Sequence, residues 1–106
     1  MAEPLTTHPR KLVTIITEAI VERELTNDLE TLGARGYTIT EARGLGSQGH
    51  RASSWEQNAN IRIEVICDIA VATRIVGHLR QRFYPDYAMV VYLADIEVLR
   101  PDKFGK

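Results

Sequence analysis

The sequence predicts an α+β fold, with a ferredoxin-like βαββαβ order in which an antiparallel sheet carries two helices on one face. Three observations predict it. A short β-branched run fills residues 12–16, a strict apolar–polar alternation fills residues 61–65, and each of these strands is followed by a stretch with helical periodicity. Two β-α-β units in 106 residues account for one domain spanning residues 1–106.

The first unit begins with the strand at residues 12–16. Apolar side chains then recur at Val21, Leu25, Leu29 and Leu32, which predicts a helix over residues 19–32 with one buried stripe. Gly33 and Gly36 follow, and both are expected to end the helix because glycine tolerates positive φ. Residues 37–42 form the second strand, whose polarity indicates partial exposure.

The second unit begins with the alternating strand at residues 61–65. Asp68 is placed to cap a helix that presents Ala72, Ile75 and Leu79 on one side, and Pro85 is expected to stop it. Residues 87–94 and 95–99 read as further strand.

Apolar strand positions exceed what two helices are expected to cover. The surplus comprises Ile61, Ile63, Met89, Val91 and Leu93. Burying it between copies is the simplest solution, so we expect a homo-oligomer.

Composition excludes several classes of protein. The net charge of -1 attracts neither nucleic acid nor an anionic membrane, so any anion site must be local. The single cysteine, Cys67, allows no internal disulfide, and no apolar run approaches the length of a membrane span. We therefore expect a soluble cytoplasmic protein.

The longest connection, at residues 43–58, is the candidate functional segment. A small domain joins its elements in about 4 to 6 residues, so a longer one is a binding segment or a flexible linker. Glycines at 44, 46 and 49 allow close approach of the backbone to an anion, Ser47 adds a hydroxyl donor, and Arg51 offers a guanidinium. Arg51 is alternatively a solvated loop cation.

Several segments together resemble PII-like signalling proteins, with the SbtB branch, regulators of a bicarbonate transporter, as the nearest type. They are Thr17-Glu18, Gly36-Tyr37-Thr38, Gly44-Leu45-Gly46-Ser47 with Arg51, Ala59-Asn60-Ile61 followed by Glu64, Asp86-Tyr87-Ala88 and Glu97-Val98-Leu99. The resemblance covers about residues 11–99, and its specificity lies in the order of the pieces.

The resemblance implies a homotrimer that binds cyclic AMP, AMP, ADP or ATP in clefts between subunits, as regulatory ligands and not as cofactors. Residues 43–58 would be the T-loop, which contacts a membrane bicarbonate transporter of the SbtA type, so that the protein would associate reversibly with the membrane. Gly44, Gly46, Ser47 and Arg51 would hold phosphate, and the backbone around Ala88 and Met89 would meet the adenine.

Two further residues complete the expected site, each with an alternative. Asn60 would orient the ligand or the loop base, or else bond its own backbone. Thr17 would contact the ligand or cap a helix.

Three departures from the family pattern stand out. Gln48, Gly49 and His50 occupy the stretch where relatives often carry a second arginine. Met89 replaces a glycine. The chain also ends without the paired cysteines that give some relatives redox control and nucleotide hydrolysis.

Two rival functions are weighed against the sensor. One is a small enzyme hydrolysing ATP or ADP with the loop as its lid, although no catalytic constellation is visible. The other is a structural or metal-responsive trimer. His8, His50 and His78 do not have the spacing of metal ligands, which counts against the metal-responsive version. We expect no enzyme, no metal site and no nucleic-acid partner.

Overall fold

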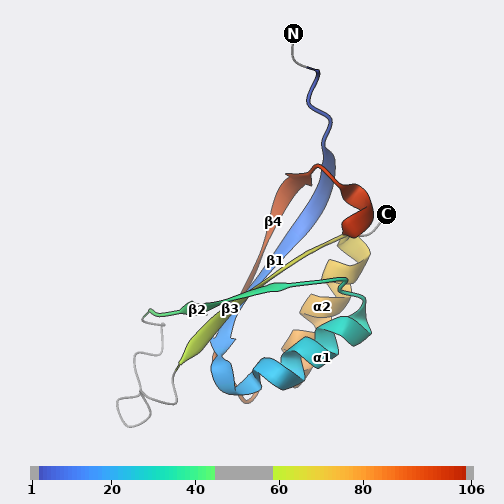
Figure 1. The fold of residues 1–106 in the computed structure, drawn as a ribbon. Coiled ribbons are helices and arrows are strands. Elements are labelled where there is room, and N and C mark those ends of the chain that lie inside the picture. The colour runs from blue at the N-terminus through green and yellow to red at the C-terminus, as the bar shows by residue number, and fades with distance from the viewer. Residues whose placement is uncertain (1–2, 45–58, 105–106) are drawn as a thin grey trace.

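The computed structural model describes residues 3–44 and 59–104. Its elements are β1 (His8–Glu18), η1 (Ala19–Val21), α1 (Glu22–Leu32), β2 (Thr38–Ala42), β3 (Asn60–Cys67), α2 (Ile69–Arg82), β4 (Met89–Val98) and η3 (Pro101–Lys103). The strands form one antiparallel sheet in the order β2-β3-β1-β4, with both helices on the same side (Figure 1). The ferredoxin-like α+β prediction is confirmed.

The strands at the centre and at one edge of the sheet are longer than their sequence patterns indicate. β1 begins at His8 and not at residue 12, because residues 8–10 pair with β4, and from Lys11 onward the strand pairs with β3 as well. These ladder hydrogen bonds carry the strand through polar residues. The two runs expected at residues 87–94 and 95–99 are one strand, β4, which starts at Met89.

The ends of the helices follow local chemistry. The first predicted helix opens as a 3-10 turn, and α1 itself starts at Glu22. Gly33 ends it at a φ of 111°, whereas Gly36 does not adopt positive φ, so that part of the expectation is wrong. The Oδ1 atom of Asp68 accepts the N–H of Val71 at 2.9 Å, which confirms the predicted cap of α2.

The core lies between the helices and the sheet face that they cover. It consists of Val13, Ile15, Val21, Leu25, Leu29, Ile61, Ile63, Val65, Cys67, Val71, Ala72, Ile75, Leu79 and Phe83. Met89 and Val91 pack against this cluster and are partly buried. The expected apolar surplus at Ile61, Ile63, Met89 and Val91 is therefore wrong, and of the five residues named only Leu93 stays widely exposed, at 46%.

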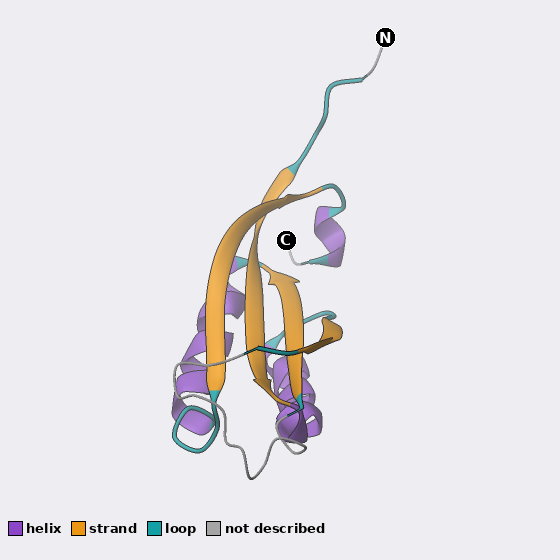
Figure 2. Cartoon of the chain, turned by 90° about the vertical axis from the view of Figure 1, so that its left-hand side faces the viewer, coloured by secondary structure: helices purple, strands orange, loops and turns teal. Residues whose placement is uncertain are grey.

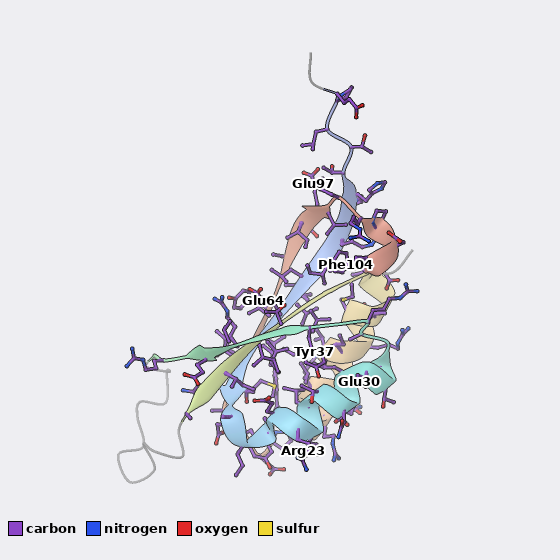
Figure 3. The ribbon with its side chains drawn as sticks, in the orientation of Figure 1. Arg23, Glu30, Tyr37, Glu64, Glu97 and Phe104 are labelled. Carbon is purple, nitrogen blue, oxygen red and sulfur yellow. The ribbon has the colours of Figure 1, made fainter. Side chains whose placement is uncertain are left out.

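The opposite sheet face carries a different set of residues, which alternate with the core positions along each strand. Figure 2 looks onto this face, with the strands in front of the helices. Leu12 and Ile16 of β1 are half-buried there, and Val90 and Tyr92 of β4 are 54% and 48% exposed. Glu64 projects to this side, away from Arg23 and Glu30 of α1 (Figure 3). Among residues 3–44 and 59–104, an apolar sheet face without a covering layer thus exists, but at other positions than those predicted.

Candidate functional site

The candidate site lies at one end of the sheet, where β1 ends and β3 and β4 begin. The register places Thr17 between Ile61 of β3 and Met89 of β4. Asn60 pairs with Glu18 on one side and with Ala42, the last residue of β2, on the other. The chain therefore enters residues 43–58 and returns from them at this same end.

Thr17 is buried, at 2% exposure, and its hydroxyl donates to the carbonyl oxygen of Ala88 at 2.9 Å. It does not cap the following helical turn, because the N-cap of η1 is Glu18, which makes no side-chain cap bond. The helix-cap alternative for Thr17 is therefore wrong. A hydroxyl that donates one bond still accepts another, so Thr17 also remains able to receive a donor.

Glu18 lies at this end as well, although it was not among the predicted site residues. Its Oε2 atom accepts the main-chain N–H of Ala88 at 2.9 Å. Two consecutive β1 side chains thus engage both polar groups of Ala88. In the sequence, the only signal for Glu18 is its position directly after Thr17 at the end of a strand. Its role as an acceptor depends on Ala88, which lies 70 positions away.

Ala88 lies at the surface, whereas Met89 packs against the core. Ala88 is exposed and directly precedes β4. Because a carbonyl oxygen has two lone pairs, that of Ala88 retains one beyond the bond from Thr17. Met89 is partly buried and packs against the core cluster. The main chain at Ala88 is thus the more accessible of the two.

The base of the long connection is held to β1. The N–H of Ala19 donates to the carbonyl of Ala59 at 2.8 Å, immediately before Asn60, which is half-buried. On the other side Arg43 and Gly44 follow β2 and are exposed, and a Cβ at Gly44 would meet no atom within 4 Å. Arg43, a cation beside the predicted glycine, is a second residue that the sequence reasoning passed over.

Five of the eight predicted site residues are therefore at this end, namely Thr17, Gly44, Asn60, Ala88 and Met89. The other three, Gly46, Ser47 and Arg51, lie outside the described residues. The described part offers a carboxylate, a hydroxyl, a carboxamide, main-chain groups and the guanidinium of Arg43. Such a set can hydrogen-bond a base or a sugar and attract an anion.

A pocket lies at the opposite end of β3 from this site. Its volume is about 240 Å³, and it is lined by Gly33, Arg35, Ile66, Cys67, Asp68, Val71 and Phe104. Burial, with a smaller contribution from the charge of Asp68, raises the pKa of the Cys67 thiol from 9.0 to about 11, which makes it a poor nucleophile at neutral pH.

Within residues 3–44 and 59–104, no group of three His, Cys, Asp or Glu side chains could hold a metal ion. In the same part of the chain, no helix is long and apolar enough to cross a bilayer.

Comparisons with known proteins agree with this geometry. The family model for nitrogen regulatory protein P-II matches residues 10–103. A chain from Thermus thermophilus, described as a PII-like signalling protein, shares 44% identity, with a TM-score of 0.80 over 92% of this chain and 97% of its own.

The CPII protein of Thiomonas intermedia, a nitrogen regulatory PII-like protein solved with ADP, AMP and bicarbonate, shares 29% identity, with a TM-score of 0.83 over 97% of this chain and 100% of its own. Its complex with ADP and bicarbonate matches at 29% identity and a TM-score of 0.83, over 95% of this chain and 99% of its own. With a sheet of the same architecture and a family match over nearly its whole length, the chain belongs to the P-II family, among the PII-like signalling proteins.

Proposed function

We propose that this chain is a PII-like sensor of the SbtB type, a single cytoplasmic domain that assembles as a homotrimer and binds an adenine nucleotide between subunits. Its residues 43–58 form the T-loop, which reports occupancy to a membrane bicarbonate transporter. The observation that carries the proposal is the convergence of Thr17, Asn60 and Ala88 on the sheet end from which this segment leaves. The related CPII, solved with ADP and AMP, supports the choice of ligand.

The roles of the residues follow from their chemistry. Ser47, Arg51 and the amides near Gly44 and Gly46 hold the phosphate, and the main chain at Ala88 and Met89 meets the adenine. Arg43 adds a cation at the base of the segment, directly after the β2 residue that pairs with Asn60. One charge-assisted contact contributes about 1.5–3 kcal/mol, which corresponds to about tenfold or more in affinity.

Titration calorimetry with cyclic AMP, AMP, ADP and ATP tests the nucleotide site. Arg51→Ala is expected to weaken phosphate-bearing ligands about tenfold or more. Arg80→Ala, which removes an exposed arginine from α2, is the matched control and should bind as the wild type does. Absence of binding heat with all four nucleotides would refute the proposal.

The transporter assignment has its own test. Deletion of residues 48–57, which also removes Arg51 and therefore weakens phosphate binding, should leave the fold and the trimer intact while abolishing co-purification with the transporter. Linkage requires that a nucleotide which changes transporter binding is itself bound differently when the transporter is present. Undiminished co-purification of the deletion variant would remove the T-loop from the interface.

Bicarbonate as a direct ligand is a second candidate, favoured by the CPII complex with ADP and bicarbonate. In this version the protein senses inorganic carbon itself. ADP would be titrated with and without bicarbonate at constant pH and ionic strength, with chloride as the matched anion. A tighter ADP affinity in bicarbonate alone supports direct sensing, and equal affinities in both salts leave only the transporter version.

Measuring phosphate release from ATP or ADP in the presence of magnesium distinguishes the enzyme alternative from the sensor. The sensor proposal expects no turnover above the buffer. Turnover that Arg51→Ala abolishes at saturating nucleotide would replace the sensor with a hydrolase.

A further inference from the structure

Two side chains of β1 engage the peptide groups of Ala88 in different ways. The hydroxyl of Thr17 donates to the carbonyl of Ala88, and the carboxylate of Glu18 accepts its N–H, each at 2.9 Å. Because a carbonyl oxygen has two lone pairs and an N–H has one proton, the carbonyl can accept a second bond while the N–H is fully used. The exposed edge at Ala88 therefore presents an acceptor and no donor.

The position of Glu18 explains why a side chain makes this bond. The β1–β4 ladder has its last pair at Thr17 and Met89, so Glu18 and Ala88 come next in the register. At this point β1 turns into η1, and the N–H of Ala19 bonds Ala59 on the β3 side. The carboxylate takes the place of the next main-chain acceptor, where the ladder stops.

Ala88 is also held from the side of α2. The N–H groups of Asp86 and Tyr87 both donate to the carbonyl of Phe83, at 3.1 and 2.9 Å, and Phe83 is fully buried. The connection from α2 to β4 is therefore fixed at its start by the core and at its end by Glu18 and Thr17. A main chain ordered before binding costs less to order when a ligand arrives.

We propose that Glu18 determines base specificity: by occupying the N–H of Ala88 it leaves only the carbonyl, which selects a purine with a hydrogen-bond donor at its 6-position. The 6-amino group of adenine is such a donor, whereas the 6-oxo group of hypoxanthine or guanine is an acceptor that would face the Ala88 carbonyl. This inference rests on the proposed function, which places the base against Ala88. Glu18 acts through Ala88 and is a positioning residue.

The test compares AMP with IMP, which differ at the 6-position of the base. The wild type is expected to bind AMP at least about tenfold more tightly than IMP. Glu18→Ala frees the N–H of Ala88, so the ratio of the two affinities should fall several-fold toward one. Glu18→Gln retains an acceptor oxygen and should keep most of the ratio, while Glu22→Ala, an exposed acid on α1, should keep all of it.

The outcomes separate the two hypotheses. If the wild type binds IMP and all four adenine nucleotides undetectably, the proposed function fails and the inference with it. If it binds another adenine nucleotide but not AMP, that nucleotide and its hypoxanthine counterpart take the place of AMP and IMP in the comparison. If AMP binds and Glu18→Ala preserves the wild-type ratio, only the inference fails. If Glu18 has a purely structural role, Glu18→Ala should weaken the binding of AMP and IMP equally and leave the ratio unchanged. That result would also refute the inference.

A measurement on the wild type alone covers the case in which Glu18→Ala does not fold. The amide of Ala88 should be protected from hydrogen exchange, unlike a solvated loop amide. Protection of this amide together with a preference for AMP over IMP supports the inference. Rapid exchange at Ala88 or equal affinity for the two nucleotides overturns it.

Discussion

The two faces of the sheet are built from the same strands but are completed in different ways. On the helix face, Val13, Ile15 and Ile63 are fully buried by residues of the same chain. On the open face Val90 and Tyr92 remain about half exposed. In the part of the chain that the structure describes, the helices cover one face only, which is why we propose that other copies of the chain cover the second.

The open face also carries charged side chains, whereas the core cluster on the helix face is apolar. On the open face Arg62 and Glu64 approach to 3.8 Å, and both are substantially exposed. Such a surface pair contributes little to stability. Thr14, which faces the open side between Glu64 and Tyr92 in the register, is 1% exposed. This face is therefore shielded at Thr14 of β1, while Arg62 and Glu64 of the neighbouring inner strand β3 stay exposed.

The largest expected effect is on the helix face. Phe83 is fully buried at the end of α2, with its ring near His78 and Tyr87 at centroid distances of 6.0 and 6.1 Å. Phe83→Ala should lower the free energy of unfolding by about 3–5 kcal/mol through lost burial and a cavity. Urea denaturation measures it, with Tyr84→Ala, at a 44% exposed neighbour, as the control. Equal losses in both variants would contradict the assigned core.

The next effect belongs to the open face. Val90→Asp should leave the folded monomer intact, because this side chain is 54% exposed, yet dissociate the proposed trimer by burying a charge at the interface. Sedimentation should show a threefold loss of mass, and the dependence of Tm on protein concentration should disappear. Gln81→Asp, on the exposed side of α2, is the matched control. A wild type that sediments as a monomer would refute the trimer.

The buried thiol of Cys67 makes the stability of the helix face depend on pH. The folded chain holds its thiol proton up to a pKa of about 11, against 9.0 ordinarily, so the folded state binds more protons than the unfolded state between these values. The stability from this group is full below pH 9 and is lost as the pH rises toward 11, with a slope of up to about 1.4 kcal/mol per pH unit. Cys67→Ala should reduce this slope in urea titrations between about pH 8 and pH 10.5. An unchanged slope would mean that the thiol is not desolvated.

The smallest effect tests the helix layer by itself. Asp68→Ala removes the cap bond to Val71 at the start of α2 and should cost about 1 kcal/mol. Asp68→Asn retains an acceptor and should recover most of it. Denaturation curves that do not distinguish these variants would show that α2 is held by packing alone.

Part of this fold is readable from short-range chemistry. The alternation at Ile61, Ile63 and Val65, the Asp68 cap and the left-handed Gly33 were all predictable, because each depends on neighbours within about four residues. The sheet end holding Thr17, Asn60 and Ala88 was assigned only through resemblance to a family. Nothing local to any one of these residues indicates the other two.

The sequence by itself determined the order of elements, the helix caps at Gly33 and Asp68 and the strand faces with clear alternation, since those follow from backbone preference and periodicity. Only the tertiary structure decided that β1 extends from His8 to Glu18 and that Met89 and Val91 join the core. It alone also brought the Glu18 carboxylate to the N–H of Ala88. The physical reason is that strand pairing joins groups about seventy residues apart, and their complementarity exists only after the chain has closed the sheet.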